Sequence, residues 1–143
     1  MNRDQERAIE WDCAKVLTEF YIYIDAGRYE EAVKMYTEDG YWTAGDMETH
    51  GRDAICESMR KGMPSKHIQH MVQNIVVNVV DEDHADAVLY ATVYRQEKTD
   101  MLPMTLSSFS PWFTGRQDNK MVRTSDGWKM AHKNIVNYLQ RSE

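Results

Sequence analysis

Residues 66–80, "KHIQHMVQNIVVNVV", have the composition and the period of a long β-strand. Valine and isoleucine dominate the stretch, and its apolar residues follow a period of two rather than 3.6. The turn "DEDH" (81–84) follows, and residues 85–98 are expected to return as the hairpin partner. One face of that partner is predicted to consist of small and aliphatic residues: Ala87, Leu89, Ala91 and Val93.

The chain before this strand has a helical period instead. In residues 4–25 the apolar side chains recur in steps of three and four, which predicts an amphipathic helix ended by Gly27. Residues 28–40 predict a second, shorter helix, and residues 51–63 predict a third. Between them, "YWTAG" (41–45) predicts a short aromatic strand.

The chain after the first hairpin predicts a second one. Residues 112–124 and 128–139 are expected to pair around the turn "SDG", whereas residues 100–111 are undecided. A run of helices followed by about four long antiparallel strands is typical of an α+β fold, with one curved sheet closing over the helices. The length of 143 residues predicts a single domain, 1–143.

Charge and hydropathy exclude several classes of function. The net charge is −6 and no basic run is present, which argues against nucleic acid and anionic membranes as partners. No segment approaches the ~20 apolar residues of a membrane span, and the charged N-terminus lacks a signal-peptide core. A cytoplasmic protein is therefore expected. Cys13 and Cys56 match no zinc or redox spacing and are expected to be small buried residues.

His67 and His70 raise the question of a metal site on the long strand. On a regular strand the even positions from 70 to 76 share one face, so His67 points to the other face and toward solvent. A bulge would bring the two rings together, but no third ligand with suitable spacing is nearby, so no metal is expected. Taken alone, His70 is more typical of a hydrogen-bonded core group than of a catalytic base.

Asp25 changes the interpretation of His70. Leu17, Tyr21 and Asp25 are spaced i, i+4, i+8 and share the apolar stripe of the first helix. The dipole at the helix C-terminus disfavours a carboxylate there by up to about 1 kcal/mol, so an ionised Asp25 needs a donor or a cation nearby. Alternatively, Asp25 caps the helix that follows. The residues alone leave both interpretations open.

Four segments of the chain resemble the SnoaL-like branch of the NTF2-like superfamily, a branch that includes scytalone dehydratase, a bacterial hexachlorocyclohexane dehydrochlorinase and a bile-acid dehydratase. The segments are "EWDCAKVLTEFYIYIDAGRYEEAVKMYTEDGYWTAG" (10–45), "GRDAI" (51–55), "KHIQHMVQNIVV" (66–77) and "DGWKMAHKNI" (126–135). The resemblance extends from about residue 6 to residue 140. It implies a cystatin-like cone in which three N-terminal helices pack on a highly curved, mainly antiparallel sheet and enclose an apolar pocket.

The resemblance also implies a catalytic pair. Lyase members pair an Asp at the end of the first helix with a His at the start of the long strand, and the matching positions are Asp25 and His70. The motif H-x-x-x-N continues to Asn74. In the implied mechanism Asp25 holds one ring nitrogen of His70, and the other nitrogen removes a proton from carbon beside an electron-withdrawing group. A hydroxide or halide then leaves, or an isomerase returns the proton elsewhere, with no metal or organic cofactor.

The chain departs from its relatives at the group that polarises the substrate, which is a tyrosine or an arginine in the lyases. Tyr21 shares the inward stripe and is the preferred substitute. Alternation allows either Tyr41 or Trp42, but not both, to line the pocket. Arg123 is a possible replacement for an arginine that some relatives carry on the last strand, or else a solvated hairpin charge. His132 faces either the pocket or solvent.

Methionines at inward positions are expected to form an adaptable apolar pocket wall, namely Met35, Met59, Met71 and Met104. Residues 101–105, "MLPMT", are expected to form a flap over the pocket mouth. Together these features predict a cofactor-independent lyase or isomerase acting on a small, largely apolar cyclic substrate. The alternative is a non-catalytic member, such as the small subunit of an aromatic-ring-hydroxylating dioxygenase or a ligand-binding module. Apolar residues on both faces of "NIVVNVV" (74–80) predict a homo-oligomer, a dimer or a trimer.

Overall fold

Three helices and six strands make up the chain in a computed structural model that describes residues 1–62, 66–97, 99–100, 103 and 110–142. The helices are α1 (Arg3–Asp25), α2 (Tyr29–Val33) and α3 (Arg52–Gly62), and the strands are β1 (Tyr36–Ala44), β2 (Met47–His50), β3 (Lys66–Val79), β4 (His84–Glu97), β5 (Phe113–Thr124) and β6 (Gly127–Gln140). Met63, Met104 and all of the expected flap except Pro103 lie outside the described residues.

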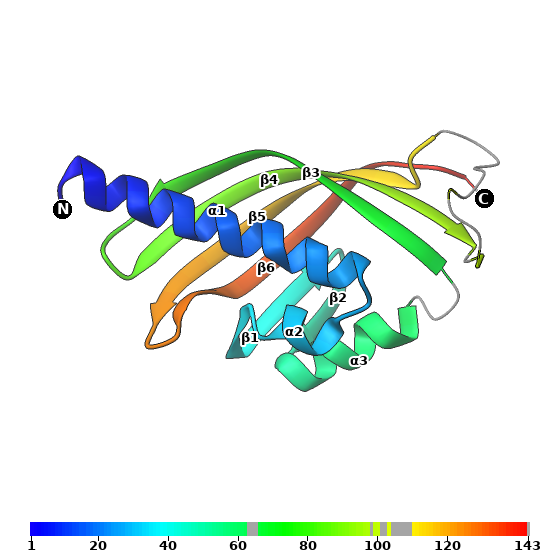
Figure 1. Cartoon of the computed structure of the whole chain (residues 1–143), viewed down its shortest axis with the longest axis horizontal. Coiled ribbons are helices and arrows are strands. Elements are labelled where there is room, and N and C mark those ends of the chain that lie inside the picture. Colours follow the sequence, from blue (N-terminus) through cyan, green and yellow to red (C-terminus); the bar gives the residue numbers. More distant parts are fainter. Residues whose placement is uncertain (63–65, 98, 101–102, 104–109, 143) are drawn as a thin grey trace.

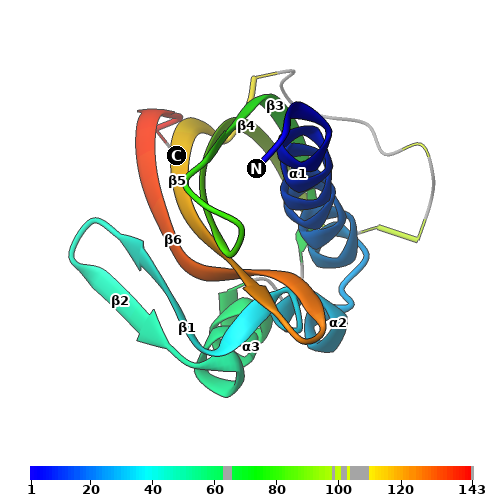
Figure 2. The ribbon, with the colours of Figure 1, turned by 90° about the vertical axis from the view of Figure 1, so that its left-hand side faces the viewer.

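The strands form one open sheet in the order β2-β1-β6-β5-β4-β3. Every neighbouring pair is antiparallel except β1 and β6, which are parallel. The sheet curves strongly, with α1 lying across its concave side and α2 and α3 near β1 (Figures 1 and 2). The predicted α+β fold, with helices packed on a curved and mainly antiparallel sheet, is confirmed. None of the described helices is long and apolar enough to cross a membrane.

The core lies between α1 and the concave face of the sheet. Asn2 caps α1 through a capping box with Gln5, and Gly27 follows the helix with a φ of 71°. The buried stripe of α1 faces the inward side chains of β4, which are the alternate residues predicted from the sequence. Each large apolar side chain buried there contributes about 1.5–3 kcal/mol. Both cysteines are buried and unpaired with each other.

The region after α2 differs from the prediction. The helix expected over residues 28–40 ends at Val33, β1 begins at Tyr36, and β2 was not predicted at all. Partners that are distant in sequence decide this, because the Met130 backbone N–H donates to the carbonyl of Met35 (2.8 Å). Arg52 also donates from Nε and Nη2 to the carbonyl of Tyr36 (2.9 and 2.6 Å). These long-range bonds override the local helical period.

A bulge in β3 changes which residues face inward. Asn74 has a φ of 52°, and the pairing with β4 shifts between Gln73 and Val76 by one extra residue on β3. Before the bulge the even positions face the core, and after it the odd positions do. The prediction that the even positions through 76 share one face is therefore wrong beyond residue 72, since Asn74 and Val76 are exposed.

Candidate active site

Asp25 and His70 meet where the end of α1 crosses β3. The Asp25 Oδ1 atom lies 2.6 Å from His70 Nδ1, and the His70 backbone N–H donates to Oδ2 over 2.8 Å. The two side chains are 21% and 10% exposed. The capping alternative does not hold, because the N-cap residue of α2 is Arg28 and no side chain caps that helix. The carboxylate is instead bound at both oxygens by one histidine.

This contact defines the state of the imidazole. A carboxylate oxygen only accepts hydrogen bonds, so Nδ1 carries the proton that it donates to Asp25. In the neutral ring, Nε2 therefore has the lone pair that a base requires. When Nε2 takes up a proton, the Asp25 carboxylate stabilises the resulting imidazolium. The backbone bond from the same residue prevents the carboxylate from turning away.

His70 borders a cavity of about 310 Å³, close to the lower end of the range for small-molecule sites, ~300–1,000 Å³. Side chains from α1, α3 and all six strands line it, and most of them are apolar or aromatic. The apolar and aromatic lining residues are Phe20, Tyr21, Ile24, Trp42, Met47, Met59, Ile68, Val93, Trp112, Phe113 and Ile135. An apolar molecule of one or two small rings fits such a volume better than a sugar or a phosphate.

A buried polar cluster forms one part of the cavity lining. Lys133 Nζ donates to Tyr21 Oη and to Gln117 Oε1, both over 3.0 Å. The Tyr21 hydroxyl donates to the same Gln117 oxygen over 2.5 Å. Lys133 is 0% exposed, and burial lowers its pKa from 10.5 to about 7. Burial also raises the pKa of Tyr21, against the hydrogen bond with Gln117 and with a smaller contribution from the Asp25 charge.

Sequence reasoning missed Lys133 and Gln117. Strict alternation from Trp128 and Met130 would place residue 132 inward and Lys133 outward. A bulge in β6, where the pairing shifts between Lys120 and Met121, inserts one residue and reverses the faces. Lys133 stands between His132 and Asn134, so local composition gives no signal, and only the register shows where its side chain lies.

The structure separates the aromatic candidates. Trp42 lines the cavity, whereas Tyr41 does not. Tyr41 is stacked between His50 and His132, with ring centroids 4.7 and 4.2 Å away. His132 Nε2 lies 2.9 Å from the Thr43 hydroxyl, so the histidine belongs to this second cluster and not to the cavity lining. Burial lowers the pKa of His132.

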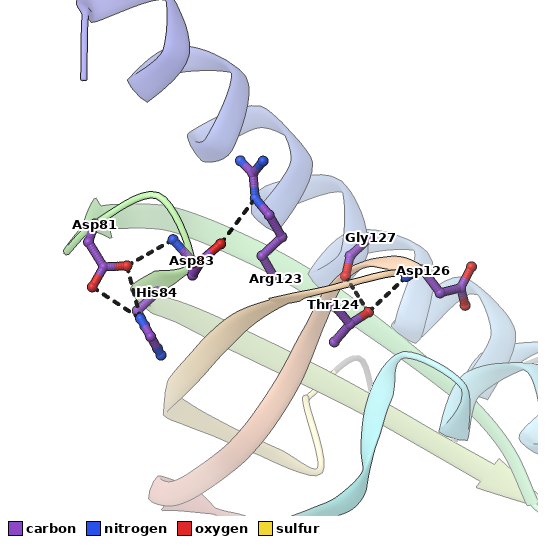
Figure 3. A network of polar contacts seen from close by, with 7 residues as sticks. All are labelled: Asp81, Asp83, His84, Arg123, Thr124, Asp126 and Gly127. Atoms are coloured by element: carbon purple, nitrogen blue, oxygen red, sulfur yellow. Dashed lines mark hydrogen bonds and ion pairs between the residues drawn. The ribbon is translucent and has the colours of Figure 1, made fainter.

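Three further predicted site residues lie elsewhere. Asn74 is exposed on the β3 bulge, and Met71 is 41% exposed because its odd position before the bulge faces away from the core. Arg123 lies at the β5–β6 hairpin, with Nε 3.9 Å from an Asp83 carboxylate oxygen and its guanidinium 5.4 Å from the Trp128 ring centre. Figure 3 shows Arg123 reaching toward the β3–β4 turn. Asn74 and Met71 therefore do not line the cavity as predicted, and Arg123 occupies the hairpin position that was its alternative.

Within the described ranges, no three His, Cys, Asp or Glu side chains are grouped closely enough to hold a metal ion. Asp81 and His84, which Figure 3 shows bonded to each other, close the β3–β4 turn. The polar side chains that line the cavity are Tyr21, Ser58, His70, Gln117 and Lys133, and Asp25 is bonded to His70.

Comparison with known proteins supports the resemblance seen in the sequence. The sequence profile of the SnoaL-like domain matches residues 5–134. A candidate scytalone dehydratase from Novosphingobium aromaticivorans superposes with a TM-score of 0.84 at 15% identity, over 99% of this chain and 92% of that one. A candidate aromatic ring hydroxylase from the same species superposes with a TM-score of 0.77 at 17% identity, over 94% of this chain and 92% of that one.

Another structure from that species, an NTF2-like protein with a cystatin-like fold, gives a TM-score of 0.78 at 19% identity, over 94% of this chain and 85% of that one. A sequence search of curated proteins finds no match. At these identities the structural likeness shows the fold alone.

Proposed function

Because the chain belongs to the SnoaL-like domain family, we propose that it is a cofactor-independent lyase or isomerase acting on a small, largely apolar cyclic substrate. The observation that carries this proposal is the Asp25–His70 pair, 2.6 Å apart, on the border of a mostly apolar cavity. An imidazole whose Nδ1–H is held by a carboxylate presents Nε2 as a general base. Its position beside an apolar cavity suits removal of a proton from carbon.

The reaction begins when Nε2 of His70 takes a proton from a carbon beside an electron-withdrawing group. The electron pair of the broken C–H bond moves into the substrate, while Asp25 stabilises the imidazolium. In an elimination, that pair forms a new double bond and a hydroxide or halide departs with the electrons of its own bond. In an isomerisation, the imidazolium returns the proton to a different carbon.

The lining of the cavity restricts the substrate. Trp42, Trp112 and Phe113 supply flat apolar surfaces for a ring. A dehydratase-type elimination agrees with the name of one fold relative, a candidate scytalone dehydratase, whose 15% identity shows the fold alone. A non-catalytic binding module would use the same apolar surfaces, but it would not require a carboxylate to hold His70 in one tautomer.

The outer face of the sheet carries exposed apolar side chains through which copies of the chain can associate. Met71, Tyr90 and Val136 are each at least two-fifths exposed there, and Tyr90 and Val136 pair with the same residue of β5, Arg116. Arg116 itself is paired with Asp118, so the face combines exposed apolar side chains with an ion pair. Exposed apolar side chains gathered on one face are typical of protein interfaces. The chain is therefore proposed to form a homo-oligomer, a dimer or a trimer, through this face.

The test is isotope exchange and elimination with cyclic hydroxy-ketones and halo-ketones in deuterated water, followed by proton NMR. The wild type is expected to exchange or eliminate the proton beside the carbonyl. Asp25→Asn and His70→Gln should each lower the rate by about 10²–10⁴-fold, the usual contribution of a general base. His67→Gln is the matched control, since His67 is an exposed histidine on the same strand. Equal rates in the wild type and the His70→Gln variant would refute the mechanism, and binding without turnover would favour the binding module.

A further inference from the structure

Lys133 is a second ionisable group in the cavity lining, and the base mechanism above does not use it. Its side chain is fully buried. The Nζ atom lies 4.4 Å from the Phe20 ring centre and 4.6 Å from the Tyr21 ring centre. The Tyr21 ring also contacts the His70 ring, with centroids 4.7 Å apart. The cation and the base therefore border the same ring and the same cavity, within the span of one small molecule.

The Lys133 ammonium group has more N–H donors than it uses in its two hydrogen bonds. An ammonium group has three N–H donors and no acceptor. Two of them are used by Tyr21 Oη and Gln117 Oε1. The Tyr21 hydroxyl proton is itself directed to Gln117, so Tyr21 cannot donate to a substrate without giving up that bond. Among the described residues no acceptor is bonded to the third N–H of Lys133, and this donor is the one that a ligand can use.

The described residues around Lys133 stabilise its positive charge through aromatic rings but provide no counter-ion. The faces of Phe20 and Tyr21 attract a cation. Both hydrogen-bond partners are neutral, and within the described part of the chain no carboxylate lies at ion-pair distance from Lys133. Asp25, the nearby acid, is bound to His70. A buried cation without a counter-ion is costly, and an anionic ligand oxygen would supply the missing charge.

We propose that Lys133 binds the carbonyl oxygen of the substrate and stabilises the enolate that forms when His70 removes the neighbouring proton. This inference rests on the proposed function and narrows its substrates to cyclic ketones and aldehydes. As the C–H bond breaks, its electron pair forms the C=C bond of the enolate, and the π pair of the C=O bond moves onto oxygen. Lys133 transfers no proton in this step; its charge and its N–H stabilise the oxyanion. Tyr21 and Gln117 are positioning residues that hold Nζ in place.

Binding of 4-nitrophenol tests the site without turnover, because its phenolate resembles an enolate and absorbs visible light. The bound phenol should have a pKa lower than in water by roughly one to three units, the usual effect of an adjacent cation. Lys133→Met should abolish that shift, whereas Lys120→Met should retain it, since Lys120 is an exposed lysine paired with Asp86 on the neighbouring strand. An unshifted or raised pKa in the wild type would overturn the inference, even if Lys133→Met fails to fold.

The His70→Gln variant separates this inference from the proposed function. It should lose carbon-proton exchange while still binding phenolate with a lowered pKa. Phenolate binding that is unchanged in Lys133→Met would overturn the role of Lys133 and leave the His70-dependent exchange intact. Conversely, a wild type that lowers the phenol pKa through Lys133 but exchanges no carbon proton supports the oxyanion site and overturns the proposed function.

Discussion

Replacing Lys133 with methionine should change how the stability of the protein depends on pH. Burial lowers the pKa of Lys133 from 10.5 to about 7. Below pH 7 both the folded and the unfolded chain hold the proton, so the full cost of burying the charge is present. As the pH rises above 7, the folded chain releases the proton while the unfolded chain keeps it, and stability increases. Lys133→Met removes this contribution.

Proton linkage gives the magnitude. Between pH 7 and pH 9 the wild type should gain about 2 kcal/mol in free energy of unfolding relative to Lys133→Met. At pH 7 the methionine should not destabilise the chain, because it fills a similar volume without an unpaired buried charge. The variant also loses the two hydrogen bonds that Nζ donates to Tyr21 and Gln117. Each lost bond lowers the free energy of unfolding by about 1 kcal/mol, which offsets part of what removal of the buried charge adds.

Urea unfolding followed by tryptophan fluorescence measures this difference at pH 7 and at pH 9. Protein concentration is held constant, because an oligomer would make the apparent stability depend on it. Lys120→Met is the control and should show the wild-type change between the two pH values, since Lys120 is exposed. If the wild type and Lys133→Met change in parallel between pH 7 and pH 9, the lowered pKa of Lys133 is refuted.

Three other predictions concern activity, backbone and assembly. Exchange of the carbon proton should decline as the pH rises through about 7, because Lys133 loses its charge there, and a rate–pH profile of Lys133→Met should lack that decline. Among the described residues, Lys133 Nζ contacts Phe20 and Tyr21 of α1 and Gln117 of β5. Asn74→Val should cost roughly 1–2 kcal/mol in thermal or urea unfolding because the φ of 52° disfavours a β-branched residue, whereas Asn74→Gly should be tolerated. Tyr90→Arg on the outer face should shift the mass found by light scattering toward the monomer; an unchanged mass would place the interface elsewhere.

Those residues of the candidate site that lie on a regular stretch of helix or strand could be predicted from the sequence. The i, i+4, i+8 spacing places Tyr21 and Asp25 on the buried stripe of α1, and alternation places His70 on the inner face of β3. Both positions lie before any irregularity in their element. The same reasoning fails for Asn74 because of the β3 bulge, and alternation does not identify Lys133 as inward because of the β6 bulge.

The wrong pocket residues have a common cause as well. Met71 is predicted to line the pocket with the other methionines, but its odd position before the bulge directs it outward. Arg123 is a candidate for the pocket only as a substitute for an arginine that relatives carry on the last strand. The predicted β5–β6 hairpin brings it opposite Trp128, whereas its contact with Asp83 of the β3–β4 turn depends on the tertiary structure. Chemical type alone does not show which face of a sheet a residue occupies.

The sequence by itself determined the amphipathic first helix, the two long hairpins, the α+β class and the family, because each depends on periodicity or motifs within a continuous segment. The tertiary structure alone decided the parallel pairing of β1 with β6, the early end of α2, and the meeting of Tyr21, Gln117 and Lys133 in one cluster. These features depend on register between segments far apart in the chain. A single inserted residue reverses that register from one face of the sheet to the other, and local composition does not record the reversal.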